Sequence, residues 1–378
     1  MKKKIFLIIA TMILVIGALT ACGKEKQSGD KASAQTKETQ ESTPQEETTP
    51  QGETAAQEEA DSQEKTTEAT PLRFALAYDT NEVAGILKIA QDKGYLDQEL
   101  GAVGYELEVN GFAQAGPAIN EAFAADSIDI ADYGNLPVTL AKAKGIGISE
   151  IGISNSKVDY AFLVKEDSDI KTLKDLEGKK VIIGVGTIIE QYWDRVVKEA
   201  GIDVSKVEII NDVATASTTF VSGNADVWIT AVSYIDVLKK QNVNVRAIES
   251  TTDNHPEWAG ETVFTVRDKF KEEHPEVVTA FLTAYYKAYQ YALAHEEETY
   301  QYLSSTMLTA ENAKKIYGAV TPLFSNFSGE ITEEEKKKQE ELIEFLLEKG
   351  YIDQKLEVTE LVDTGFYEEA VKKAAENQ

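Results

Sequence analysis

Short apolar strand patterns alternate with helical patterns along the chain from Leu72 to Val266. In the first unit, a strand pattern at Leu72–Ala77 runs into the polar turn 78–81, and a helical pattern covers Glu82–Lys93. Such alternation is typical of βαβ units, whose strands lie in mostly parallel sheets. Beyond Val266 the pattern is almost entirely helical. The sequence therefore predicts an α/β fold with parallel-rich sheets and a helical C-terminal third.

A segment of very different composition precedes this part of the chain. Gly23–Pro71 is made of small, polar and charged residues and contains no aromatic one. It cannot bury enough apolar surface to offset a backbone ordering entropy of about 1–2 kcal/mol per residue, so we expect a disordered acidic linker. Leu72–Gln378 exceeds the roughly 250–300 residues over which one core grows, which favours two lobes.

The N-terminus has the order of an export signal. Met1–Lys4 is positively charged, and Ile5–Ala21 is an apolar run shorter than the roughly 20 residues of a membrane span. Leu19–Cys22 resembles the lipobox of bacterial lipoproteins. The resemblance implies a signal peptide over 1–21, a lipid of the palmitate-bearing diacylglycerol type on Cys22, and an anchor and linker over 22–71. The alternatives are a secretory signal with an incidental cysteine and an uncleaved anchor helix.

The charge balance limits the partners of the chain. Its formal net charge is −27, from 65 Asp and Glu against 38 Lys and Arg. A strongly acidic surface disfavours nucleic acid and anionic lipid headgroups, so membrane attachment must depend on the lipid. Cys22 is the single cysteine, which excludes an intrachain disulfide. We expect a lipid-anchored protein on the extracytoplasmic face of the cell membrane, stable on its core alone.

Six segments of the chain have the form of ordered landmarks: Ala115–Ile130, Asp132–Pro137, Leu173–Val181, Phe220–Trp228, His274–Val278 and Leu361–Phe366. In this order they resemble the landmarks of the extracytoplasmic solute-binding proteins of nitrate, sulfonate and taurine importers. The resemblance implies a two-lobed periplasmic-binding-protein type II fold with two crossover strands, which closes on its ligand. It implies one lobe from 72–162 and 262–378 and another from 163–261. Thr230–Tyr234 departs from the pattern of many sulfonate binders, so a simple alkylsulfonate is not implied as the ligand.

The candidate ligand site lies where strands end and loops lead into helices. Ligands bind at this edge of open α/β sheets, and free N–H groups at helix starts, such as those predicted at Pro117 and Pro137, attract anions. Glycine lets a ligand approach the backbone closely, and Asn135 and Thr187 can add hydrogen bonds. The candidate ligand-binding residues are Tyr78, Asp79, Gln114, Gly116, Tyr133, Gly134, Asn135, Gly186, Thr187, Thr230 and Tyr234.

Two features of this set have competing interpretations. Asp79 would repel an anion but could pair with the amine of a zwitterion, or it could cap the following helix. Tyr133 and Tyr234 are the aromatic residues most expected to line a small organic ligand. The stripe Phe281, Tyr285, Tyr289 and Ala292 has helical spacing and is expected to be core.

Together these features predict a lipoprotein that captures a small anionic or zwitterionic organic solute, of the sulfonate or taurine kind. It would deliver the solute to an ABC permease and its ATPase. The alternatives are the same fold binding a pyrimidine, a thiamine precursor or another nitrogenous solute, a sensor without a permease, and a synthase. We disfavour the synthase because such enzymes need histidine and cysteine chemistry, and His255, His274 and His295 have no metal-ligand spacing. We expect a monomer without catalytic residues, metal or cofactor.

Overall fold

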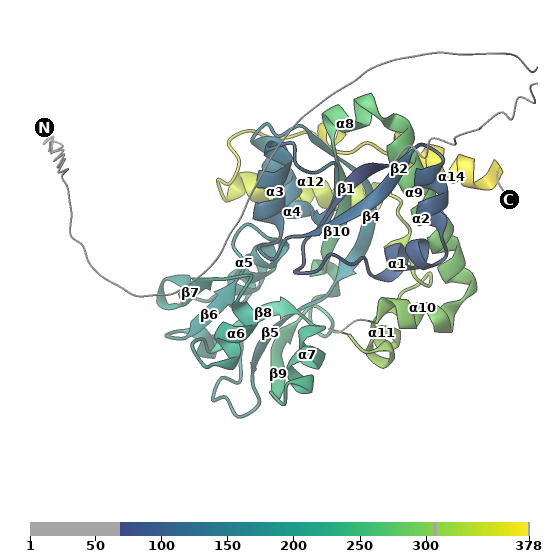
Figure 1. Cartoon of the computed structure of the whole chain (residues 1–378). Helices are drawn as coiled ribbons and strands as arrows, with labels where there is room; N and C mark the ends of the chain where they lie inside the picture. The colour runs from purple at the N-terminus through teal and green to yellow at the C-terminus, as the bar shows by residue number, and fades with distance from the viewer. Residues whose placement is uncertain (1–68, 305–307, 377–378) are drawn as a thin grey trace, which may run out of the picture. The chain divides into compact units, whose positions relative to one another are not determined.

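Two five-stranded sheets form the framework of the computed structural model, which describes residues 69–304 and 308–376 (Figure 1). The predicted signal peptide, Cys22 and all of the linker except 69–71 lie outside the described residues. The described residues belong to one compact unit of the chain. Among them, no helix has the length and apolar character needed to cross a membrane.

The first sheet has the order β2-β1-β3-β10-β4 and the second the order β7-β6-β8-β5-β9. The strands of the first are β1 (Thr70–Leu76), β2 (Tyr105–Gly111), β3 (Ile130–Gly134), β4 (Ile148–Val158) and β10 (Gly260–Arg267). Those of the second are β5 (Tyr160–Lys165), β6 (Lys180–Ile183), β7 (Glu208–Asn211), β8 (Val227–Ala231) and β9 (Val245–Ser250).

Each sheet combines parallel and antiparallel pairings. In the first sheet β1 is parallel to β2 and β3, whereas β10 is antiparallel to β3 and β4. In the second sheet β6 is parallel to β7 and β8, whereas β5 is antiparallel to β8 and β9. The predicted α/β fold is confirmed, but its sheets are evenly mixed. The reversed strand of each sheet, β10 in the first and β5 in the second, is the strand that the chain enters when it passes over from the other sheet.

Helices follow most strands of the two sheets. Those of the first part are α1 (Gly85–Asp92), α2 (Tyr95–Gly101), α3 (Gly116–Ala124), α4 (Asn135–Ala143), α5 (Ile188–Ala200), α6 (Ala216–Val221) and α7 (Tyr234–Lys240). The C-terminal part holds α8 (Asp268–Glu273), α9 (Pro275–Ala294), α10 (Glu296–Leu303), α11 (Ala310–Tyr317), α12 (Glu333–Glu348), α13 (Val358–Leu361) and α14 (Gly365–Glu376). Short 3-10 turns occur at Leu173–Leu176, Val204–Lys206, Pro256–Trp258 and Ser325–Phe327.

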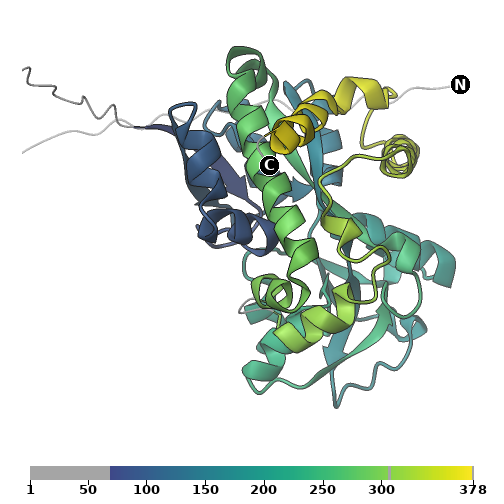
Figure 2. The ribbon, with the colours of Figure 1, turned by 90° about the vertical axis from the view of Figure 1, so that its right-hand side faces the viewer.

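The alternation of side chains along β1 divides the first core into two layers. Phe74 packs with the helices α1, α2 and α9, whereas its neighbour Ala75 packs with α3 and α4 on the other face. The long helix α9 and the C-terminal α14 lie side by side in Figure 2. The ring of Phe281 on α9 lies 5.4 Å from that of Phe74 and 5.3 Å from that of Phe264. Phe281, Tyr285 and Ala292 of the predicted stripe are buried in this core, as expected, and the partly exposed Tyr289 packs against it.

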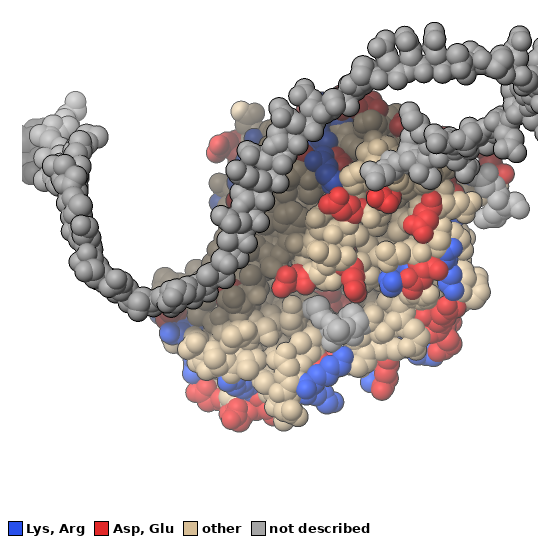
Figure 3. Space-filling model, viewed as in Figure 1, with Lys and Arg blue, Asp and Glu red and all other residues tan. Residues whose placement is uncertain are grey.

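The second sheet is likewise covered on both faces. Phe162 of β5 packs against Tyr192 and Trp193 of α5 on one face. Leu163, one residue further, packs on the other face with Leu238 of α7. Figure 3 shows that acidic and basic side chains are interspersed around a broad uncharged area on one face of the molecule. The net negative charge is therefore not collected into one patch there.

Candidate ligand-binding site

Six side chains gather where the ends of strands from the two sheets come together. The chain passes from β4 to β5 through the single residue Asp159, which brings the carboxyl ends of β1 and β3 near the start of β5. The six side chains are Tyr78, Asp132, Asp159, Tyr160, Tyr234 and Tyr317, and we call them the tyrosine–carboxylate cluster. Tyr78 connects them, because Asp132, Tyr160, Tyr234 and Tyr317 all lie within electrostatic range of its hydroxyl.

Tyr78 follows β1 and is positioned by a tight contact between its loop and the end of β2. Gly111 N donates to the Asn81 side-chain oxygen at 2.8 Å. A Cβ at Gly111 would lie 2.2 Å from Thr80 O and 2.7 Å from Tyr78 O, so the approach requires glycine. Half of the Tyr78 side chain (51%) is exposed, yet crowding around it and the charge of Asp132 raise the pKa of its hydroxyl. The hydroxyl is therefore a neutral donor at neutral pH.

Gly111→Ala is expected to displace the loop that carries Tyr78. The added methyl group overlaps the loop backbone, so we expect a destabilisation of about 1–3 kcal/mol and weaker binding of any ligand that contacts Tyr78. Thermal unfolding and ligand titration measure both effects. Gly101→Ala is the matched control, because a Cβ there meets no atom within 4 Å. Equal behaviour of the two variants would show that the loop does not depend on Gly111.

Asp132 contributes a carboxylate from β3 to the cluster. Its Oδ1 lies 2.5 Å from the Ser154 hydroxyl, which lies 2.7 Å from that of Thr262. No Lys, Arg or His of the described residues forms an ion pair with Asp132. Burial raises the pKa of Asp132 from 3.8 to about 7, against the opposing effect of the Ser154 hydrogen bond. The ligand-free site therefore holds a carboxyl group that is only partly ionised at neutral pH.

Asp159 and Tyr160 bring further polar atoms to the connection between β4 and β5. Asp159 is 7% exposed, and its Oδ1 accepts a hydrogen bond from Thr251 Oγ1 at 2.9 Å, but its buried Oδ2 has no partner. Tyr160 is 2% exposed and its hydroxyl also has no partner. Buried polar atoms are rarely left without a hydrogen bond. These two atoms therefore have the capacity to bind a ligand.

Tyr234 and Tyr317 come from helices far apart in the sequence. Tyr234 begins α7, and its ring lies 4.6 Å from that of Trp228, edge to face. Tyr317 ends α11 and lies near Asn155 of β4. The two helices are tied together, because Asp236 of α7 accepts from Asn312 of α11 at 2.6 Å. The cluster thus draws on both sheets and on the C-terminal helices.

The predicted anion-binding loops have protein groups in close contact. Asn135 Nδ2 donates to Glu261 at 3.2 Å and to Gln339 at 3.4 Å. Thr187 caps α5, accepting from Ile189 N at 3.3 Å, and donates to Gly184 O at 2.7 Å. The glycines of these loops are also close to other protein atoms. A Cβ added at Gly116 would lie 2.4 Å from Pro137, and one added at Gly134 would lie 2.8 Å from Ile188. Gly186 N donates to the Glu190 side chain at 2.7 Å. Their ligand-binding role stays a prediction.

The other predicted residues are distributed between the core and the surface. Tyr133 is buried, and its hydroxyl donates to Asn120 at 2.9 Å. Thr230 is buried in β8 next to the cluster strand β5. Asp79 and Gln114 are exposed. Asp79 does not cap α1, whose N-cap position is Ala84. Of the predicted set, Tyr78 and Tyr234 lie in the cluster.

Asp132, Asp159 and Tyr317 were not predicted as site residues. Asp132 lies inside the segment 132–137 that resembles the family pattern, and Asp159 directly precedes a predicted strand, so their positions could have suggested them. Tyr160 begins a predicted strand, and aromatic residues at strand ends are usually core, so the sequence alone does not single it out. Nothing in the sequence indicated Tyr317, because its helix reaches the cluster only through tertiary contacts.

Two cavities lie apart from the cluster. One of about 470 Å³ is at the opposite end of the first sheet and is lined by residues that include Asp126, Gly147, Arg267 and Lys269. Another of about 260 Å³ lies beside the segments that connect the sheets, next to Lys157, Asn326 and Lys338. Neither takes its lining from the carboxyl ends of β1 and β3, where the fold favours ligand binding. We therefore place the candidate site at the cluster.

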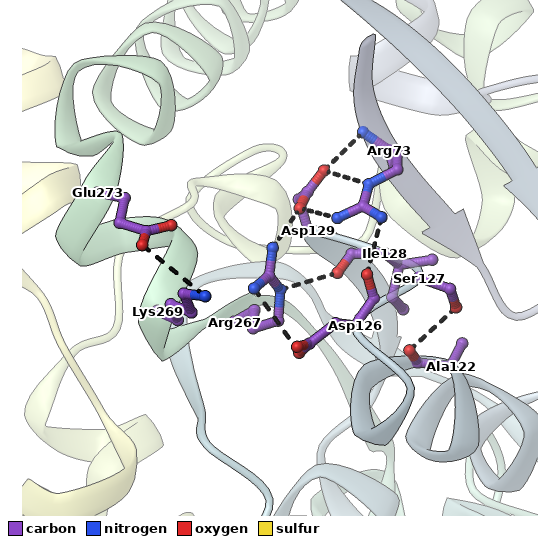
Figure 4. Close-up of polar contacts among 9 residues, drawn as sticks. All are labelled: Arg73, Ala122, Asp126, Ser127, Ile128, Asp129, Arg267, Lys269 and Glu273. Carbon is purple, nitrogen blue, oxygen red and sulfur yellow. Dashed lines mark hydrogen bonds and ion pairs between the residues drawn. The ribbon is translucent and has the colours of Figure 1, made fainter.

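An ion network holds the opposite end of the first sheet (Figure 4). Asp129 Oδ1 lies 2.6 Å from Arg73 of β1 and 2.8 Å from Arg267 of β10. Arg73 also donates to Asp126 O at 2.8 Å. Burial favours the protonated form of Asp129, but the hydrogen bonds from the two arginines outweigh it and lower the pKa. This network joins strands and leaves its carboxylate fully paired, unlike Asp132.

The three histidines are not part of the tyrosine–carboxylate cluster. His255 stacks on Trp258 at 3.8 Å, His295 stacks on Tyr291 at 3.8 Å, and His274 contacts Tyr105. Within 69–304 and 308–376, no group of three or more His, Cys, Asp or Glu residues could hold a metal ion. The cluster therefore offers hydroxyl donors, aromatic rings and carboxylates as its chemistry.

Residues 81–299 match the NMT1/THI5-like family, and the chain belongs to it. A protein of Bacillus subtilis (strain 168), named as a candidate aliphatic-sulfonate-binding protein, is 29% identical over 292 residues, which cover 76% of this chain and 85% of that protein. The crystal structure of a candidate periplasmic sulfonate-binding protein of Methylobacillus flagellatus KT has a TM-score of 0.64 at 21% identity, covering 82% of this chain and 96% of that one.

The same fold also occurs in an enzyme. The crystal structure of the desulfurization enzyme DSZB has a TM-score of 0.61 at 15% identity, covering 80% of this chain and 99% of that one. The periplasmic-binding-protein fold is thus confirmed, but a fold alone does not separate a binding protein from an enzyme. The site must carry the functional conclusion.

Proposed function

We propose that the protein is an extracytoplasmic solute-binding protein that captures a small organic solute at the tyrosine–carboxylate cluster and delivers it to an ABC importer. The observation that carries the proposal is the convergence of polar and aromatic side chains from both sheets at the strand ends, with unpartnered buried atoms at Asp159 and Tyr160. A ligand that contacts both sheets stabilises the arrangement in which they approach, which a permease can recognise. The binding proteins among its relatives support the same role.

A thermal-shift panel tests this function. Taurine, alkanesulfonates, nitrate, pyrimidines, flavins and amino acids are the compounds to compare. A ligand at a hundredfold excess over its Kd is expected to stabilise the protein by about 2.7 kcal/mol. Tyr234→Ala should reduce the shift, whereas Tyr302→Ala, a partly exposed tyrosine of α10, should not. If no compound shifts the melting temperature, a transport role is contradicted. Cells that lack the protein should also lose uptake of the ligand.

The resemblance of Leu19–Cys22 to a lipobox supports a lipid anchor, which would keep the receptor beside its permease. Cys22 lies outside the described residues, so the proposal rests on the sequence. Cys22→Ser is expected to release the protein from membranes into the medium, and to abolish labelling with radioactive palmitate. Both can be measured by fractionation of cells. Continued membrane retention of the variant would instead support an uncleaved anchor helix.

A further inference from the structure

Charge at the cluster points to a narrower class of ligand. Its titratable groups are the carboxyls of Asp132 and Asp159 and the phenols of Tyr78, Tyr160, Tyr234 and Tyr317. No described Lys, Arg or His forms an ion pair with either carboxyl group. Lys157 lowers the pKa of Asp159 through space, while Asp253 raises it. A sulfonate beside Asp132 would face a carboxyl group without a cation to balance its charge.

The carboxyl oxygens of the cluster also need hydrogen-bond donors from a ligand. Asp132 uses Oδ1 for Ser154, and the buried Asp159 Oδ2 has no donor. Asp159 acts electrostatically on Tyr317, and Tyr78 acts on Tyr160, so each of the two residues with an unpartnered atom lies within electrostatic range of a ring of the cluster. An ionised carboxylate can only accept hydrogen bonds. An ammonium or amidinium group supplies donors and positive charge together, and aromatic faces attract it further.

We propose that the solute carries a protonated nitrogen group, an ammonium or amidinium, which donates to Asp132 and lies near the ring of Tyr78. This inference rests on the proposed function and assigns Asp132 as the residue that selects the ligand charge. It predicts that an aminosulfonate binds through its amine, and that a plain alkanesulfonate binds weakly. The state of the predicted anion-binding loops is consistent with this proposal, because Asn135, Thr187 and Gly134 are already in contact with other protein groups.

Pairs of compounds that differ in a single group test the proposal by calorimetric titration. Taurine and isethionate differ only by an ammonium in place of a hydroxyl, and propylamine carries the ammonium without a sulfonate. For taurine or any other amine found in the panel, we expect binding about 10–100-fold tighter than that of its hydroxyl counterpart. In Asp132→Asn this difference should disappear. The control Asp97→Asn removes the same charge from an exposed site of α2 and should change the affinity less than threefold.

The pH dependence of affinity gives an independent readout. The groups that face Asp132 are Ser154, Tyr78 and Tyr285, and none of them titrates between pH 6 and 8. Because the pKa of Asp132 is about 7, the affinity for an amine should fall about tenfold from pH 8 to pH 6. The affinity for an anion should rise over the same range. Asp132→Asn should flatten either profile.

The outcomes separate this inference from the proposed function. If isethionate binds as tightly as taurine, or if Asp132→Asn leaves the binding of an amine unchanged, the inference is overturned and the solute-binding role stands. If sulfonates without nitrogen are the ligands found, the result is the same. If no compound of the panel binds, both fail. Thermal unfolding of Asp132→Asn at pH 8 shows whether the variant is folded.

Discussion

Asp129→Asn is expected to destabilise the protein by about 3 kcal/mol, because it leaves two guanidinium groups of the first sheet without their shared carboxylate. The Asp129 side chain is 3% exposed, and Arg267 is 12% exposed. Removing one partner of a buried ion pair leaves an uncompensated charge, which typically costs about 3–5 kcal/mol. Arg73 is 32% exposed and can rehydrate, so we expect the lower end of this range. Urea unfolding at pH 7 measures the change.

A surface pair provides the matched control for Asp129. Asp92→Asn breaks the Lys88–Asp92 pair of α1, whose side chains are each 38% exposed, and should cost about 0–0.5 kcal/mol. The pH dependence has a defined sign. The folded-state pKa of Asp129 is lowered, so its contribution is present above the unfolded value of 3.8 and is lost as pH falls through the folded pKa. The stabilities of the two proteins should therefore converge as the pH falls below 3.8 through the folded-state pKa of Asp129. A difference that stays constant until both proteins unfold in acid would contradict the pairing.

Asp132→Asn is expected to have the opposite effect and to stabilise the ligand-free protein at pH 8. Burial raises the folded-state pKa of Asp132 to about 7, against 3.8 for the unfolded chain. Between these values the folded state binds more protons than the unfolded state, so the wild type loses stability as pH rises. The full difference would amount to about 4 kcal/mol, and partial solvation reduces our expectation to about 2–3 kcal/mol above pH 7.

The measurement is the free energy of unfolding of both proteins at pH 4 and pH 8 without ligand. At pH 4 the carboxyl group is protonated in the folded state, and asparagine replaces it with little cost because its oxygen still accepts from Ser154. Asp97→Asn should show no such dependence. If the wild type is as stable as Asp132→Asn at pH 8, then Asp132 is well solvated. That result would also weaken the assignment of Asp132 as the ligand-selecting residue.

Together the two carboxylates show how one sheet separates stability from binding. Asp129 and Asp132 are three residues apart, before and within β3. Asp129 meets arginines from β1 and β10 at one end of the sheet. Asp132 lies toward the other end, where the described residues provide hydroxyl groups but no cation to pair with it. A carboxylate kept unpaired in a crowded place costs stability, as is common at functional sites.

Much of the fold could be predicted because local patterns agree with it. The apolar strand Leu72–Leu76 and the helix that starts after Gly134 follow from period and turn chemistry. The first helix was predicted from Glu82 but begins at Gly85, because the loop after β1 folds back onto Gly111. The antiparallel share of each sheet was not predicted. It depends on where β4, β5, β9 and β10 pair, and strand pairing over long separations leaves no local signal.

Two residues of the predicted ligand site lie in the candidate cluster, and the ligand-binding role of the predicted set stays a prediction. Tyr78 and Tyr234 lie in the cluster, and both follow strands, where the general rule for α/β sheets directs attention. Asn135 also follows a strand, but its amide meets Glu261 and Gln339, which are more than 120 residues away in the sequence. A turn motif identifies a loop that can bind an anion. It does not show which side chains from distant segments already hydrogen-bond the groups of that loop.

The sequence by itself determined the alternation of strands and helices, the acidic linker composition, the lipobox-like Leu19–Cys22 and the family, because each is encoded in neighbouring residues or in their order. Only the tertiary structure decided which polar groups are satisfied. It brought Tyr317 within electrostatic range of Tyr78, paired Asp129 with two arginines and left Asp132 without a cation. The physical reason is that the charge and hydrogen bonding of a buried group depend on partners brought from distant segments, which no local pattern specifies.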